Sequence, residues 1–350
     1  MKKKILSALT ATLILGVVSP TFAAPIDDEV AELRARLAQL ERRIAERDAR
    51  IEYESERVDD LERGVNRHTN QTNWAEKFKV NGELRYRFWN MNRRDDVSQL
   101  QLRILPSVQI NENFAVKTRF TASYNMNSDT ESDWRANFAY LEGKFNRFQI
   151  NAGKLPLFTE ADGGMVADDF FSGVQAIVDV GDTAKLRGNV GHWDEKGDYL
   201  GAEVTVNPNE NLDFGVGYHH FRRNKDNIVA GGVGYQLNDD WKLNAAVAYN
   251  NKANSHKTAY NLEANYHGAN RKEVGSWGAY AAYRYVGSGV GIVPTYDTYG
   301  QTANKRGFEI GAGYTPFTDT LLKVSYFHGK SFDAGHPTDR TFFARASLFF

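Results

Sequence analysis

The sequence predicts an all-β fold, a transmembrane antiparallel β-barrel of about 16 strands, with an N-terminal α-helical coiled coil ahead of it. Three observations lead to this prediction. Apolar residues recur every seven positions between Val30 and Val65, they recur every two positions from Lys77 onward, and the second pattern continues to the terminal Phe350. A period of seven is typical of coiled-coil helices, and a period of two is typical of strands whose two faces meet different surroundings.

The end of the chain is the strongest indication of a barrel. The predicted last strand has an apolar face that consists of Phe342, Ala344, Ala346, Leu348 and Phe350. Its other face carries Arg345 and Ser347. A soluble protein rarely ends in an uncovered strand with so apolar a face, whereas a membrane barrel must end on a strand that closes against the first one.

The first residues have the pattern of a secretory signal. Basic residues at Lys2 to Lys4 precede an apolar run from Ile5 to Val18 and small residues up to Ala24, so residues 1–24 are predicted to be a signal peptide. After them, no apolar run approaches the roughly 20 residues that a helix needs to cross a bilayer. The absence of cysteine excludes disulfides and thiolate metal sites, and the net charge of -1 gives no indication of a nucleic-acid partner.

Residues 25–67 are predicted to form a coiled coil. Its apolar core positions are Val30, Leu33, Leu37, Leu40, Ile44, Ile51, Val58, Leu61 and Val65. Arg47 and Glu54 occupy the remaining d positions and weaken the middle of this seam. Three of the four g-to-e′ pairs are opposite in charge, which favours parallel helices in register. The coil alone is compatible with two or three strands, and the alternative interpretation is a single solvated, charged helix.

A polar linker, residues 68–76, separates the coil from the barrel, residues 77–350. The alternating segments are predicted to begin near Phe78, Leu100, Phe114, Trp134, Phe148, Val174, Ala184, Leu200, Leu212, Asn227, Trp241, Tyr260, Trp277, Phe308, Leu321 and Thr341. A soluble β-sandwich would also alternate, but it would seldom place aromatic residues at so many strand ends. Short turns belong to the periplasm and the long loops, 159–169 and 287–304, to the exterior, so the coil and Phe350 are predicted to be periplasmic.

Several motifs carry a resemblance to a known family. They are the signal and coiled coil, the opening strand from Phe78 to Phe88, the stretch from Asn151 to Pro156 before an acidic, Gly-rich loop, and the final hairpin. Together they make the chain similar to bacterial outer-membrane porins of the type with an N-terminal periplasmic coiled coil. The resemblance implies an outer-membrane homotrimer in contact with lipid, with a water-filled channel through which small polar or ionic solutes diffuse passively. We expect no cofactor and no metal.

The inward register of the early strands is predicted to be basic. The pore-lining basic residues are Arg85, Arg87, Arg103, Lys117, Arg119, Arg135, Lys185 and Arg187. The loop after the fifth strand carries the acidic residues Glu160, Asp162, Asp168 and Asp169, and in porins the corresponding loop folds into the pore. Opposite charges across a constriction create a transverse field, and an excess of basic charge would favour anions. Later acids such as Glu203 and Glu309 offset this excess, and the alternative is that the arginines only pair with Glu83 and other wall acids.

Three other functions have less support. An enzyme would need a nucleophile motif such as G-x-S-x-G, and His192, His219 and His220 with scattered serines do not provide one. Calcium could bind near Asp162 and residues 168–169, but the spacing does not match an EF-hand. The coiled coil could instead tether the envelope to the cell wall with the barrel as its anchor, although no folded wall-binding domain precedes it.

Overall fold

The computed structural model describes residues 74–350 except 129, 132, 195 and 300–302, together with scattered positions between Leu37 and Val58. From Trp74 onward the chain forms one compact unit. The described residues include no helix that is both long enough and apolar enough to cross a membrane. The predicted signal peptide, the linker up to residue 73 and most of the predicted coiled coil lie outside the described residues.

Strands make up nearly all of this unit. A short helix, α2 (Trp74–Lys77), comes first, and two 3-10 turns, η1 (Glu160–Asp162) and η2 (Asp297–Tyr299), interrupt the series. The strands are β1 (Phe78–Met91), β2 (Val97–Gln109), β3 (Phe114–Asn125), β4 (Thr130–Glu131), β5 (Arg135–Phe145), β6 (Phe148–Phe158), β7 (Asp168–Val180), β8 (Ala184–Trp193), β9 (Gly197–Asn209), β10 (Leu212–Phe221), β11 (Asp226–Gln236), β12 (Trp241–Asn250), β13 (Thr258–His267), β14 (Trp277–Val286), β15 (Lys305–Tyr314), β16 (Thr320–Ser331) and β17 (Thr338–Phe349).

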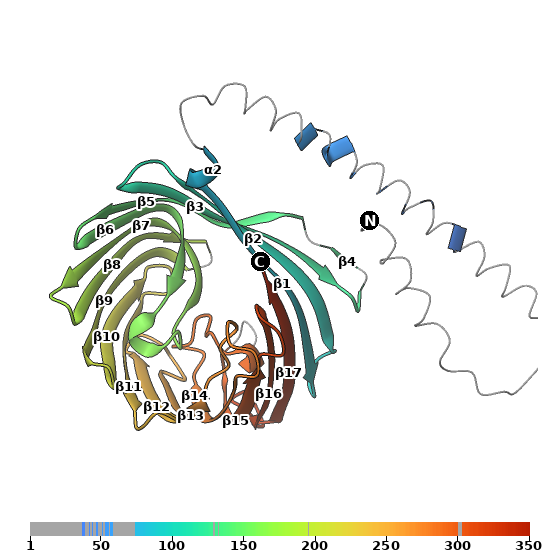
Figure 1. Ribbon diagram of the computed structural model, residues 1–350. Helices are drawn as coiled ribbons and strands as arrows, with labels where there is room; N and C mark the ends of the chain where they lie inside the picture. The colour runs from blue at the N-terminus through green and yellow to red at the C-terminus, as the bar shows by residue number, and fades with distance from the viewer. Residues whose placement is uncertain are drawn as a thin grey trace, which may run out of the picture. The chain divides into compact units, whose positions relative to one another are not determined.

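The strands form one closed antiparallel sheet (Figure 1). Each strand pairs with the next along the chain, and β1 pairs with β17 over the register from Glu83↔Phe349 to Met91↔Thr341. The fragment β4 pairs with the same strand as β5, namely β3, so the two form one interrupted strand. The wall therefore has about 16 strands, as the sequence predicts.

The last residue completes the closure. The amide of Phe350 donates to the Gly82 carbonyl at 3.1 Å, and the amide of Gly82 donates to the Phe350 carbonyl at 2.8 Å. A Cβ on Gly82 would lie 2.1 Å from the Phe350 ring, so the ring needs a glycine opposite it. The alternation at the end of the sequence is thus explained by a strand that seals the barrel against β1.

The two faces of the wall differ as the period of two predicts. On β1, Glu83 is buried inside, whereas Phe78, Val80 and Tyr86 are exposed on the outer face. On the outer face of β14 and β15, the pair Tyr283↔Phe308 and the pair Trp277↔Tyr314 are separated by smaller apolar residues. Two aromatic rows that border an apolar band are the arrangement expected at the two interfaces of a bilayer.

A row of glycines lets β6 and β7 leave the wall. Gly153 pairs with Gly173, and Gly173 pairs with Gly191. A Cβ on Gly173 would lie 2.2 Å from the Val190 carbonyl oxygen, and Gly153 has a φ of 134°, which side chains disfavour. Just beyond this row, β6 loses its pairing with β5 after Ala139↔Lys154 and keeps only β7. The upper part of the β6–β7 hairpin is therefore free to bend away from β5.

The main hydrophobic core lies beneath this hairpin, inside the barrel. Its members include Leu155, Leu157, Phe171, Tyr199 and Phe221, all of them less than 3% exposed. They come from β6 and β7 on one side and from β9 and β10 on the other. One sector of the lumen is consequently filled by packed side chains.

The hairpin also corrects one boundary predicted from the sequence. Asp168 and Asp169 begin β7 and pair with Phe158 and Leu157, so they are strand residues and not part of the loop. The loop itself is limited to residues 159–167. The predicted loop was too long because β6 and β7 continue beyond the barrel wall. There the two faces of the strands no longer meet lipid and water, so the sequence does not alternate between apolar and polar residues.

Candidate functional site: a lumen narrowed by two loops

Two long loops fold into the ring of strands. The loop with η1, residues 159–167, contacts the inner side of β9 to β12, and the described part of the loop with η2, residues 287–299, lies against it (Figure 1). The amide of Ile292 donates to the Val166 carbonyl at 2.9 Å, and the amide of Thr295 donates to the Gly164 carbonyl at 2.9 Å. The sequence indicated the inward fold of the first loop, whereas that of the second was missed.

Asp297 fastens the second loop to the wall. Its carboxylate lies 2.8 Å from the Lys323 ammonium and 3.6 Å from the Arg345 guanidinium. Its carbonyl accepts a hydrogen bond of 2.9 Å from the indole of Trp89. Burial by itself would raise the pKa of Asp297, but Lys323 and Arg345 outweigh burial and hold the pKa below its usual value. The carboxylate is therefore charged when the loop is in place.

Arginines gather on the inner face of β1 to β3. Arg85 binds Glu83 through two hydrogen bonds, and Arg103 lies 3.7 Å from the same carboxylate. Arg87 and Arg119 are close enough to Arg85 for mutual repulsion. Together with Lys323 and Arg345 they form what we call the arginine cluster: Arg85, Arg87, Arg103, Arg119, Lys323 and Arg345. Among the described residues, the cluster forms ion pairs with Glu83 and Asp297, and Asp168 and Asp169 also attract Arg119. The six cations still outnumber these four carboxylates.

Aromatic rings support this cluster. The Arg119 guanidinium lies 4.7 Å from the centre of the Phe170 ring and 5.2 Å from that of Phe138. The guanidinium of Arg87 lies 5.0 Å from the Trp89 ring and donates to Gln99. Rings fix a cation by its attraction to their faces without neutralising its charge. The cluster is thus held in place while its positive charge remains available.

Other members of the predicted basic set have different surroundings. Lys117 pairs with Glu142 at 2.9 Å. Arg187 pairs with Glu160 and lies 3.6 Å from Glu203, so it connects the first loop to the wall. Arg135 and Lys185 are exposed, the former opposite Thr121 and the latter beside the cavity described below. The contacts fit the alternative interpretation for part of the set, since Arg85 and Arg103 pair with Glu83 and since Lys117 and Arg187 also pair with carboxylates.

The predicted acidic residues also differ from one another in their partners and burial. Asp168 accepts a hydrogen bond of 2.8 Å from Thr295, and Asp169 accepts one of 3.0 Å from the indole of Trp193. Asp162 is 2% exposed, and its Oδ1 accepts from the Thr159 hydroxyl at 2.7 Å. Burial raises the pKa of Asp162 to about 6, although hydrogen bonds from Thr159 and the loop backbone act against this rise. Asp162 therefore serves to hold the loop.

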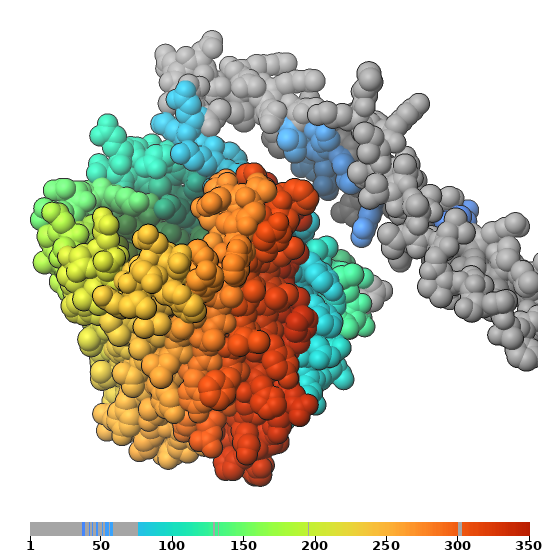
Figure 2. Space-filling model, turned by 60° about the horizontal axis from the view of Figure 1, so that its bottom comes forward, coloured from blue at the N-terminus to red at the C-terminus, as the bar shows by residue number. Residues whose placement is uncertain are grey.

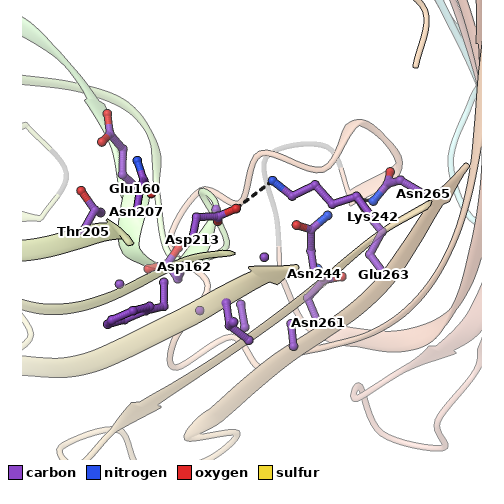
Figure 3. Close-up of a pocket in the computed structure, with 18 of the residues that line it drawn as sticks. Glu160, Asp162, Thr205, Asn207, Asp213, Lys242, Asn244, Asn261, Glu263 and Asn265 are labelled. Carbon is purple, nitrogen blue, oxygen red and sulfur yellow. Dashed lines mark hydrogen bonds and ion pairs between the residues drawn. The ribbon is translucent and has the colours of Figure 1, made fainter. Parts of the chain in front are cut away.

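A polar cavity of about 1420 Å³ lies inside the barrel and is lined by both loops and by β7 to β16. It is lined by carboxylates and carboxamides, which include Asp179, Asp182, Asn207, Asp213, Asn244, Asn261, Glu263 and Asn265. Figure 3 shows several of them with the ion pair between Asp213 and Lys242, whose charged atoms lie 2.8 Å apart. Deeper in, Arg284 lies 2.5 Å from both Glu263 and Glu309. Some of these charges are thus paired, and the cavity also borders Asp297 and Lys323.

Some functional residues could not be selected from the sequence. Lys323, Arg345 and Asp297 belong to the same group as the predicted arginines but lie more than 170 positions from them. The only local signal was the inward parity of Arg345 on the last strand. Within the described ranges, no group of three or more histidine or acidic side chains is arranged to hold a metal ion.

The closed, loop-narrowed barrel defines a porin-type fold. No protein-family model matches the chain, and no curated protein matches its sequence. Solved structures do match: two engineered mutants of the porin from Rh. blastica have a TM-score of 0.56 at 12% identity, covering 78% of this chain and 100% of theirs. A triple mutant of the Rhodopseudomonas blastica porin matches at 0.55 and 13% identity, with the same coverage. At this identity the likeness establishes the fold alone.

Proposed function

We propose that the protein is an outer-membrane porin through which small hydrophilic solutes and ions diffuse passively, with a preference for anions. The barrel is wide enough for an aqueous channel, because about 16 strands enclose more space than wall side chains fill. The observation that carries the anion preference is the arginine cluster, whose cations exceed the carboxylates that contact it. Cations in excess of the nearby carboxylates, in a confined lumen with low-dielectric walls, concentrate anions.

The test is single-channel recording in a planar bilayer with a salt gradient across it. Wild type should give large, persistent current steps and a reversal potential of the sign expected for anions. The double variant Arg85→Ala with Arg87→Ala should shift this potential toward cations, because it removes two cluster charges. Arg222→Ala with Lys225→Ala removes the same charge from the β10–β11 loop, residues 222–225, and should shift the potential much less.

Two outcomes would contradict the proposal. Folded protein without current steps would mean a closed barrel and would favour a structural role. An unchanged reversal potential in the Arg85 and Arg87 variant would contradict the proposed anion preference but not the proposed channel function.

We also propose that the N-terminal coil joins three chains in the periplasm. Four predicted a positions, Leu37, Ile44, Ile51 and Val58, are described, helical and between 53% and 64% exposed. An apolar row this exposed on one chain supports a partner helix. Deletion of residues 30–65 should abolish trimers in native electrophoresis. Loss of envelope attachment with trimers intact would instead support the tether to the cell wall.

A further inference from the structure

The outer surface of the barrel carries a cationic patch at its extracellular end. Four exposed residues on β15, β16 and β17 form it: Arg306, His328, Lys330 and Arg340. Arg306 lies directly opposite Lys330, and His328 lies directly opposite Arg340. We call these four residues the rim patch. The outer surface of the strands that carry it, coloured orange to red, faces the viewer in Figure 2.

The rim patch points away from the lumen. Its neighbours along the strands, Lys305, Phe327, Ser331 and Thr341, are buried on the inner side. Because successive side chains of a strand alternate, the residues between them project outward. On the same outer face, the next rows toward the periplasm carry exposed apolar side chains, among them Phe308, Tyr326, Phe342 and Val324. The rim patch thus borders the band that faces lipid.

No carboxylate of the described residues forms an ion pair with the rim patch. The acids nearest to it along the chain are engaged elsewhere. Asp333 lies 3.0 Å from Arg93, and Asp339 turns inward to Lys305 at 3.1 Å.

Like charges directly opposite each other on adjacent strands are destabilising. The pair of Arg306 and Lys330 has this arrangement, at a Cα separation of about 5 Å that is typical of antiparallel pairs. An anion bound between the two side chains would remove the repulsion. The arrangement therefore calls for a ligand from outside the chain.

We propose that the rim patch binds the phosphate groups of an outer-leaflet lipid. Arg306 and Lys330 would share one phosphate, since guanidinium groups bind phosphate through paired hydrogen bonds and ammonium groups bind it as point charges. Arg340 would take a second phosphate, one row nearer the apolar band. The lipid, and not a soluble anion, is the occupant because the aromatic and aliphatic residues below the rim patch would contact its acyl chains.

The experiment measures lipid binding to the full-length, folded protein in detergent by native mass spectrometry. The probes are diphosphorylated lipid A and the same lipid with its phosphates removed. Wild type should retain the phosphorylated lipid, and Arg306→Ala with Lys330→Ala should bind it about tenfold or more weakly, since each basic residue contributes to phosphate attraction at a membrane surface. Arg222→Ala with Lys225→Ala, which loses the same charge on another extracellular loop, should bind as wild type does.

Equal binding by wild type and the Arg306 and Lys330 variant would overturn the proposal. Equal weakening in both double variants would also overturn it, because the effect would then be one of net charge. Displacement of the lipid by inorganic phosphate at equal concentration would assign the rim patch to a soluble anion. Heat-modifiable migration checks folding, and Arg306→Gln with Lys330→Gln replaces the alanine variant if that one fails to fold.

Discussion

The two sectors of the lumen differ in how they use their inward side chains. Beside β1 to β3, inward residues are arginines that repel one another and have few acidic partners. Beside β8 to β14, inward residues pack against the β6–β7 hairpin, form closed ion pairs such as that of Arg284 with Glu309, or line the polar cavity. The same alternating wall therefore produces a core and a polar cavity in one sector and an excess of cations in the other.

This difference has an energetic basis. Each large side chain buried under the hairpin, such as Phe171, Tyr199 or Phe221, contributes roughly 1.5–3 kcal/mol relative to exposure. The repulsion within the arginine cluster acts in the opposite direction. We infer that the filled sector stabilises the barrel and positions the loops, which allows the other sector to keep unneutralised charge.

The largest expected effect comes from emptying the filled sector. Phe171 is 1% exposed, and its ring meets that of Tyr199 edge to face at 5.4 Å. Phe171→Ala should lower the free energy of unfolding by about 3–5 kcal/mol, because it leaves a cavity under the hairpin. Urea unfolding in detergent, followed by tryptophan fluorescence, measures the loss.

The matched control removes the same ring from the lipid-facing surface. Phe308 is 68% exposed, so Phe308→Ala should cost much less. Equal losses in the two variants would mean that the core beneath the hairpin does not stabilise the barrel more than its surface does.

The next effect concerns the bend that brings the hairpin inward. A Cβ on Gly191 would lie 2.2 Å from the Ser172 carbonyl oxygen, whereas a Cβ on Gly188 in the same strand would meet open space. Gly191→Ala should therefore destabilise the barrel by about 1–3 kcal/mol, as overpacked sites do. Gly188→Ala should be nearly neutral in the same unfolding assay. Similar values for the two would show that close approach between β7 and β8 is not needed for the bend.

The wall was predictable from the sequence, while the contents of the lumen were not. Alternation is a local pattern, so it predicted the strands, their approximate number and the closure of the last strand against the first, which the pairing of β17 with β1 confirms. The inward course of residues 287–299 depends on contacts with Lys323, Arg345 and Trp89, which lie on other strands. The glycine row was visible as single residues, but its members become neighbours only once the register of three strands is known.

A third effect should appear as a pH dependence of stability. Asp162 holds the first loop, and its Oδ2 is buried without a hydrogen-bond partner among the described residues. Its pKa is raised to about 6, above the value near 3.9 of an unfolded aspartate, so the folded state binds the proton more tightly. This contribution to stability is complete below about pH 4 and is lost as the pH rises to about 6, with a total of about 3 kcal/mol.

Asp162→Asn keeps the Oδ1 acceptor for Thr159 and cannot ionise. The difference in unfolding free energy between wild type and this variant, measured from pH 4 to pH 8, isolates Asp162 from other acids. We expect the unfolding free energy of the variant to increase relative to that of wild type as the pH rises. A constant difference would show that Asp162 does not change its charge in this range.

The smallest expected effect tests the acidic side of the lumen. Asp168→Asn with Asp169→Asn keeps acceptors for Thr295 and Trp193 but removes two negative charges. The reversal potential should move toward anions, by less than Arg85→Ala with Arg87→Ala moves it toward cations, because basic charge already dominates the open sector. Asp239→Asn with Asp240→Asn, an adjacent acidic pair in the turn before β12, should have a weaker influence, since its charges lie outside the strands. An unchanged reversal potential in the first variant would mean that Asp168 and Asp169 do not act on passing ions and that the field of the lumen comes from other charges, among them the arginine cluster and Asp297.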